Sequence, residues 1–148
     1  MNKNKVVSNN FSATNIGTLG ELHNHVYDPK DIPGKYKGKL FLKELLDLTS
    51  MEVSINSMAS GESMPFFHRH NESEELFICL GGCGEMQVDE SRFSISEGSV
   101  IRMAPQAERT WRNISDSELK YIIVQAKVDS CDFELSSDGE GVNREVLW

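Results

Sequence analysis

One stretch of the sequence decides the fold and contains the candidate site: Gly61-Glu-Ser-Met-Pro-Phe-Phe-His68-Arg-His70-Asn-Glu-Ser-Glu-Glu75-Leu-Phe-Ile-Cys-Leu-Gly-Gly82. Residues two apart in a β-strand point to the same face, so His68 and His70 are expected to share one. Glu75 begins a very apolar run, and a hairpin between the two strands brings its carboxylate back to the histidines. Two imidazoles and one carboxylate are a common ligand set for iron, manganese, nickel or zinc. The stretch predicts one divalent transition metal at His68, His70 and Glu75; the alternative is two histidines on a half-buried strand face without a metal.

After Thr49 the sequence consists of short runs in which apolar and polar residues alternate. Gly, Pro, Asp, Asn or Ser separates these runs roughly every 8–12 residues, which is typical of a β-sandwich or barrel. The region is therefore expected to be all-β. The predicted strands are Glu52–Met58, Pro65–His70, Glu75–Leu80, Glu85–Asp89, Arg92–Ile95, Ser99–Met103, Arg109–Asn113 and Leu119–Lys127.

The two ends of the chain differ from this middle part. Residues 1–38 are rich in Asn, Lys, Gly and Asp, which predicts an irregular N-terminal arm, and residues 39–148 are expected to form one barrel domain. The segment Leu40–Leu46 is too short for periodicity to decide between helix and strand. At the other end, Trp148 is expected to pack back on the body.

Composition and charge limit the classes of function. The 148 residues, 39% of them hydrophobic and 26% charged, are ordinary for a single globular domain. The formal net charge of -8 repels phosphate backbones and anionic lipids, so neither nucleic acid nor a membrane is an expected partner. No signal peptide or spanning helix is recognisable, and a cytoplasmic location is expected. Three cysteines without a C-x-x-C pair fit reduced thiols.

The stretch quoted above resembles the first motif of the cupin superfamily: Gly, five residues, His-x-His, three or four residues, Glu, six residues, Gly. Here four residues separate His70 from Glu75, and six separate Glu75 from Gly82. The departure is that six residues, not five, separate Gly61 from His68. Glu74 is an alternative ligand, because a gap of three residues is also allowed. We prefer Glu75, because it shares a strand face with the apolar side chains two and four residues later.

Residues 98–113 resemble the second cupin motif in length. The two motifs together therefore span residues 61–113. Ala104 and Gln106 stand where the motif has Pro and Gly, and Arg109 stands where it has the third histidine ligand. The run from Arg102 to Asn113 is similar to a subgroup of small bacterial cupins with an "APxGxRxWRN" signature. A guanidinium has no lone pair to offer a metal. Three outcomes follow: the metal is held by three ligands alone, the cation abolishes metal binding, or Arg109 clamps an anionic group of a ligand. A fourth alternative is that Arg109 points outward and pairs with surface acids.

The resemblance implies a double-stranded β-helix, the jelly-roll barrel, closed around a small central cavity. It implies a small-molecule ligand, which the arginine suggests is anionic, and a homodimer. Arg109, Trp111 and Phe77 are the expected substrate-binding residues, and no catalytic residue is assigned. The expected function is a metal-dependent enzyme of dioxygenase or isomerase type; the alternatives are a binding or sensing protein without turnover and a structural metal site. A second His-x-His, His23 and His25, lies in the arm and is expected on the surface.

Overall fold

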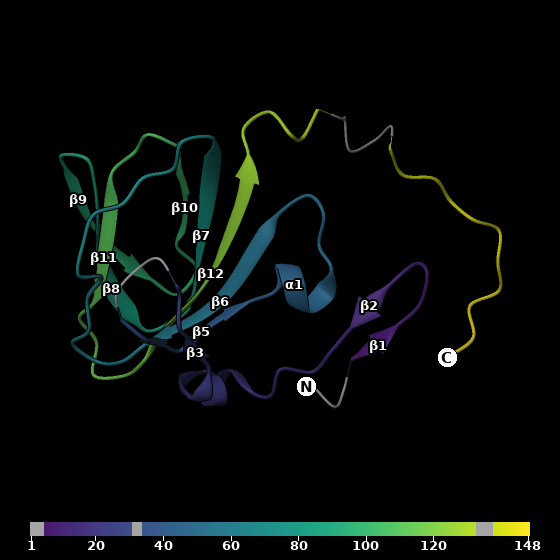
Figure 1. The fold of residues 1–148 in the computed structure, drawn as a ribbon, viewed down its shortest axis with the longest axis horizontal. Coiled ribbons are helices and arrows are strands. Elements are labelled where there is room, and N and C mark those ends of the chain that lie inside the picture. The colour runs from purple at the N-terminus through teal and green to yellow at the C-terminus, as the bar shows by residue number, and fades with distance from the viewer. Residues whose placement is uncertain (1–4, 31–33, 133–137) are drawn as a thin grey trace.

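Two antiparallel β-sheets face each other in the computed structural model, which describes residues 5–30, 34–132 and 138–148 (Figure 1). The five-stranded sheet has the order β10-β7-β12-β6-β5, and the three-stranded sheet has the order β11-β8-β9. The strands of the first sheet are β10 (Val100–Met103), β7 (Ser73–Gly81), β12 (Leu119–Lys127), β6 (Glu52–Met58) and β5 (Lys39–Phe41). Those of the second are β11 (Arg109–Asn113), β8 (Cys83–Val88) and β9 (Ser91–Ser96). The predicted all-β jelly-roll barrel is confirmed.

The core fills the space between the sheets, because alternate side chains of each strand point inward. Along β7 the buried residues are Glu75, Phe77 and Cys79, and along β11 they are Arg109, Trp111 and Asn113. The ring of Phe77 stacks on Tyr121 with centroids 4.8 Å apart, and Trp111 packs edge-on against both rings. The core is completed by Met58, Met86, Ile95, Met103, Leu119 and Ile123.

A tight turn at Gly82 carries the chain from β7 in one sheet to β8 in the other. Gly82 has a φ of +81°, in the left-handed region that favours glycine, and a Cβ at this position would lie 2.6 Å from the carbonyl oxygen of Glu118. Glycine is therefore required here both for the turn and for the close approach of the chain before β12.

Seven of the eight predicted strands are present in the structure, and one prediction is wrong. Residues Pro65–His70 form no regular strand; the strand-like pairing of the loop between β6 and β7 with β11 is limited to the isolated bridges Ser63–Arg112 and His68–Arg109. Pro65 has no N–H to donate to a ladder, and the loop does not stay beside one partner long enough for continuous pairing. The undecided segment splits into β5 and a single helical turn, α1 (Lys43–Leu46).

The N-terminal arm contains local structure that lies against the barrel. Its elements are the hairpin β1 (Val6–Val7) with β2 (Ser12–Ala13), the 3-10 helix η1 (Leu19–Asn24), and the pair β3 (Val26–Tyr27) with β4 (Tyr36–Lys37). The carboxylate of Glu21 accepts a 2.9 Å hydrogen bond from the backbone N–H of Thr18 and so caps η1. Leu22 of this helix is buried, and η1 packs against β6 and β5. The arm thus lies against β5 and β6, at one edge of the five-stranded sheet.

The C-terminal residues 138–148 are exposed, and Trp148 is fully exposed, so its predicted packing on the body is wrong. Figure 1 shows this segment running clear of the barrel. Among the helices that the structure describes, none has the length and apolar character needed to cross a membrane.

Candidate metal centre

Backbone hydrogen bonds to two other segments fix the loop that carries the two histidines. The N–H of His68 donates to the carbonyl of Arg109 at 3.1 Å, and the N–H of Arg109 donates back at 3.0 Å. The N–H of His70 donates to the carbonyl of Pro105 at 2.9 Å. The loop therefore behaves locally like a strand beside β11, and the two imidazoles fall on the same side although the regular strand is missing.

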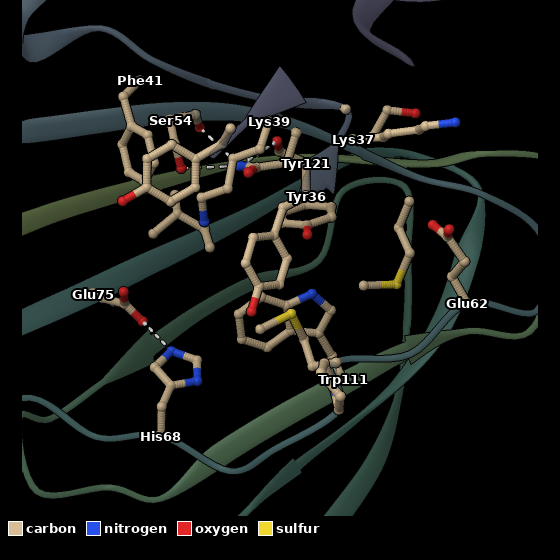
Figure 2. Close-up of a pocket in the computed structure, with 18 of the residues that line it drawn as sticks. Tyr36, Lys37, Lys39, Phe41, Ser54, Glu62, His68, Glu75, Trp111 and Tyr121 are labelled. Carbon is tan, nitrogen blue, oxygen red and sulfur yellow. Dashed lines mark hydrogen bonds and ion pairs between the residues drawn. The ribbon is translucent and has the colours of Figure 1, made fainter. Parts of the chain in front are cut away.

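Glu75 completes the cluster from the neighbouring β7. One potential ligand atom from each of His68, His70 and Glu75 lies within 4.8 Å of the other two, and this group can hold a metal ion. Nε2 of His70 is 2.8 Å from Oε1 of Glu75. Nε2 of His68 is 4.0 Å from Oε2 of the same carboxylate, and Figure 2 shows these two side chains facing each other. The side chain of Glu75 is 6% exposed, whereas those of His68 and His70 are 25% and 26% exposed. The carboxylate thus forms the inner end of the cluster and the imidazoles its open side.

The structure distinguishes the two neighbouring glutamates geometrically. Glu74 points to the outer face of the sheet, where its carboxylate accepts a 2.6 Å hydrogen bond from Nε of Arg102. Glu75 points inward, as its shared face with Phe77 predicted. Because successive side chains of a strand alternate, only one of these carboxylates can reach the histidines.

Arg109 is fully buried, and its guanidinium contacts the same carboxylate. Nε and Nη2 lie 3.0 Å and 2.8 Å from Oε2 of Glu75. Nη1 donates to the backbone carbonyls of Ala107 at 2.9 Å and Pro105 at 3.2 Å. The arginine at the third-histidine position therefore faces the cluster, but its donors are directed at Glu75 and at backbone rather than at the cavity.

The charges of the cluster set its protonation. Burial acts to raise the pKa of Glu75, but the hydrogen bond from His70 and the charge and hydrogen bond of Arg109 outweigh it, so this pKa lies below its usual range. Burial lowers the pKa of His68 to about 4; Glu75 opposes this, whereas Arg109, His70 and Lys39 add to it. Near neutral pH the cluster therefore contains an ionised carboxylate and a neutral His68, the forms in which both groups bind metals.

A cavity of about 490 Å³ opens beside the cluster, between the inner face of the five-stranded sheet and the loop of the histidines. Trp111 and Tyr121 lie on its wall, and the arm contributes Tyr27 and Tyr36. Figure 2 shows His68 and Glu75 at one side of this pocket and Phe41 and Lys39 across from them; other lining residues include Asn56, Met58 and Ile123. Burial raises the pKa of Tyr121 to about 12, so its phenol stays protonated.

The three expected substrate-binding residues occupy different places, and their contacts with a substrate stay predictions. Trp111 lies on the cavity wall, Phe77 is fully buried behind Tyr121, and Arg109 does not line the cavity. In the arm, His23 is exposed, with Nδ1 3.8 Å from Oε1 of Glu118, and a ring nitrogen of His25 lies 3.4 Å from a backbone carbonyl.

Sequence reasoning missed the contribution of the arm and of Lys39 to the cavity. The alternation of Tyr36, Gly38 and Leu40 with lysines indicates an extended segment, but nothing in it indicates which cavity the lysines approach. The three cysteines were expected to be reduced, and Cys79, Cys83 and Cys131 are free thiols.

Comparisons with known proteins agree with this fold. Residues 55–125 match the cupin domain family. The solved structure of a cupin protein from Bacteroides fragilis is 29% identical, superposes with a TM-score of 0.68, and the match covers 78% of this chain and 93% of that one. Residues 55–125 therefore form a cupin domain, and the double-stranded β-helix inferred from the two motifs is its fold.

Two further matches are more distant or shorter. A predicted oxalate decarboxylase from Thermotoga maritima is 18% identical with a TM-score of 0.56, over 64% of this chain and 83% of that one, and this likeness shows the fold alone. An uncharacterised protein of Methanocaldococcus jannaschii is 32% identical over 60 residues, which are 40% of this chain. The match spans 48%, about half, of the length of that relative.

Proposed function

We propose that this cupin binds a small molecule next to a divalent metal held by His68, His70 and Glu75. The observation that carries the proposal is the convergence of their three ligand atoms within 4.8 Å at the wall of a cavity of about 490 Å³. Ligand pockets are usually concave, largely apolar and provided with a few convergent polar groups, and this cavity has those features.

The residues of the cluster fit a metal, with one opposing feature. His68 is neutral, and its Nε2 faces Oε2 of Glu75 at 4.0 Å, so that a nitrogen able to bind a metal is directed at the carboxylate. At His70 and Glu75 a metal would take the place of the 2.8 Å contact between Nε2 and Oε1. Arg109 opposes the metal, because it neutralises the carboxylate and repels a second cation. We therefore infer weaker binding than that of a site with a histidine at position 109.

A divalent metal in this site supplies Lewis acidity, and a redox-active one also supplies electrons. The protein supplies the rest. The aromatic walls exclude water and hold the apolar part of a ligand, with Trp111 as the wall residue expected to contact it. Tyr121 offers a protonated hydroxyl, and Arg109 holds the carboxylate of Glu75 in place. The proposed reaction is of dioxygenase or isomerase type on a small anionic metabolite.

A second function is favoured by the ion pair between Arg109 and Glu75. Because the guanidinium already supplies positive charge to Glu75, the cluster is satisfied without a metal. The protein then binds or senses a metabolite without converting it. The two functions differ in metal requirement: ligand binding depends on the metal in the first and survives chelation in the second.

Metal analysis of variants tests the proposal. The purified protein, equilibrated with excess zinc or manganese and freed of unbound ion, is expected to keep close to one metal per chain. The double variant His68→Ala/His70→Ala should lose it. The matched control is His23→Ala/His25→Ala, which removes the same dipeptide pattern from the arm and should keep the metal. Equal metal content in both double variants would show that the ligand assignment is wrong.

A further inference from the structure

Lys39 extends a positive charge into the cavity from the edge of the five-stranded sheet. It is the first residue of β5 and pairs in register with Asn56 of β6. Its Nζ lies 4.9 Å from the ring centroid of Phe41, two residues along the same face, in a cation–π contact. Figure 2 shows Lys39 among Phe41, Ser54 and Tyr121, across the pocket from His68. The lysine thus lies on the wall opposite the metal cluster.

The ammonium of Lys39 forms no ion pair or hydrogen bond with the residues that the structure describes. The carboxylates that line the cavity are already engaged. Glu75 is paired with Arg109, Glu52 accepts a 3.0 Å hydrogen bond from the N–H of Lys43, and Glu62 accepts one of 2.8 Å from a backbone N–H. An ammonium group has three donors, and leaving them unpaired away from water is unfavourable.

Electrostatics agree with this placement. Burial lowers the pKa of Lys39, and the negative charges of Glu75 and Glu52 partly oppose that effect. The charge of Lys39 in turn contributes to the lowered pKa of His68. The lysine and the metal cluster therefore belong to one electrostatic environment within the same cavity.

Arg109 was the expected partner for an anionic ligand, but its donors face Glu75, Pro105 and Ala107. Of the other lysines and arginines on the cavity wall, Lys35 pairs with Asp28 at 3.0 Å and Arg69 lies 3.7 Å from Glu108. Lys37 also lines the cavity, but its side chain is exposed to solvent. Among the described residues, Lys39 is then the partly buried lysine whose donors remain for a ligand.

We propose that Lys39 is the anion-binding residue of this cavity, and that the ligand is a small organic acid whose carboxylate pairs with the Lys39 ammonium. The planar or apolar body of the acid lies among the aromatic side chains and reaches toward His68 and Glu75. This inference rests on the proposed small-molecule function and adds the ligand class and the residue that selects it.

The chemistry of the walls favours a carboxylate over a phosphate. Sites for phosphate dianions usually gather several cations or backbone N–H groups, whereas the described lining of this cavity offers one unpaired, partly buried ammonium together with three carboxylates. The aromatic rings of Phe41, Trp111 and Tyr121 suit an apolar body. Asn56 adds a buried Oδ1 without a partner among the described residues, an acceptor for a donor group on the ligand.

The test compares an acid with its neutral amide. Benzoate and benzamide have nearly the same shape and differ in charge, and inorganic phosphate provides a third probe. Calorimetric titration of the wild-type protein at pH 7 should show benzoate binding at least about tenfold more tightly than benzamide, as expected for one charge-assisted contact. Lys39→Met should remove that preference and leave benzamide binding unchanged. Lys39→Arg, which keeps the charge, should retain most of it.

Lys43→Met is the matched control, because Lys43 is exposed on α1 and does not line the cavity. It should bind benzoate as the wild type does. If Lys39→Met does not fold, Lys39→Gln takes its place. The comparison of benzoate with benzamide in the wild type tests in any case whether the cavity prefers an acid. Equal affinity for acid and amide, an unchanged preference in the Lys39 variants, or tighter binding of phosphate than of benzoate would overturn the inference.

Metal content measured on the same preparations separates this inference from the proposed function. A protein that keeps its metal but does not prefer the acid contradicts the role of Lys39 alone. A protein that prefers the acid through Lys39 but binds no metal contradicts the metal centre and leaves the anion site standing.

Discussion

Replacing Arg109 with histidine isolates the effect of the guanidinium on the metal cluster. In the structure two guanidinium nitrogens lie 3.0 Å and 2.8 Å from Oε2 of Glu75, so a metal must share that carboxylate with a buried cation. Hydrogen bonds to charged groups contribute about 1.5–3 kcal/mol. Removing this competition should lower the dissociation constant for a divalent metal by about tenfold to a hundredfold, before any gain from the new imidazole ligand.

The same substitution should lower the stability of the metal-free protein. Glu75 is buried and loses its cation, and breaking a buried ion pair on one side costs about 3–5 kcal/mol. Metal should restore part of this, because a ligand present at a hundred times its dissociation constant stabilises the folded state by about 2.7 kcal/mol. Arg109→His is therefore expected to be less stable than the wild type without metal and to gain more from zinc.

Calorimetric titration with zinc, together with urea unfolding with and without zinc, measures both effects. The control is Arg102→His, because Arg102 holds Glu74 at 2.6 Å on the exposed outer face of the same sheet. Losing that exposed pair should lower the free energy of unfolding by at most about 1 kcal/mol and should leave the zinc affinity unchanged. If Arg109→His matches the wild type in zinc affinity and in metal-free stability, the arginine does not act on the cluster, and our reasoning fails.

Three further predictions concern stability and assembly. The pKa of His68 is about 4 in the folded protein and 6.5 in the unfolded chain, so between these pH values the unfolded chain binds a proton that the folded protein does not. Urea unfolding of the metal-free protein should therefore show the free energy of unfolding fall by up to roughly 3 kcal/mol as the pH is lowered from 6.5 toward 4. The fall should be smaller in His68→Gln. Phe77→Ala should cost about 3–5 kcal/mol by the same assay, because Phe77 is fully buried, whereas the more exposed Phe93→Ala should cost much less; equal costs would contradict the packing. Light scattering at micromolar concentration should give the mass of a homodimer, and a monomer would refute this expectation.

The strands could be predicted because alternation and turn residues are local signals. The bounds of β6, β11 and β12 agree with those predicted, and the same alternation indicated that Glu75 rather than Glu74 faces inward. The loop of the histidines shows the limit of that reasoning. Its alternation suggested a strand, but strand formation also requires a continuous partner, which an isolated bridge to Arg109 does not provide.

The partners of the long cationic side chains could not be predicted. Motif spacing indicated that Arg109 approaches the metal ligands, but its binding to Glu75 and to two carbonyls depends on the packing of β11 against β7 and on the turn before it. The rest of β5, α1, β6 and the loop of the histidines separate Lys39 from Glu75 in sequence, and only the sheet brings both to one cavity. Local patterns therefore predict faces, and tertiary packing determines which charges meet.

An anomalous diffraction map of crystals grown with zinc, recorded at the zinc edge, locates the metal relative to the three proposed ligands. We expect one peak per chain, about 2.0–2.2 Å from a nitrogen of His68, a nitrogen of His70 and an oxygen of Glu75. An empty cluster with Glu75 still paired to Arg109, or a peak only at other residues such as His23 and His25, would contradict it.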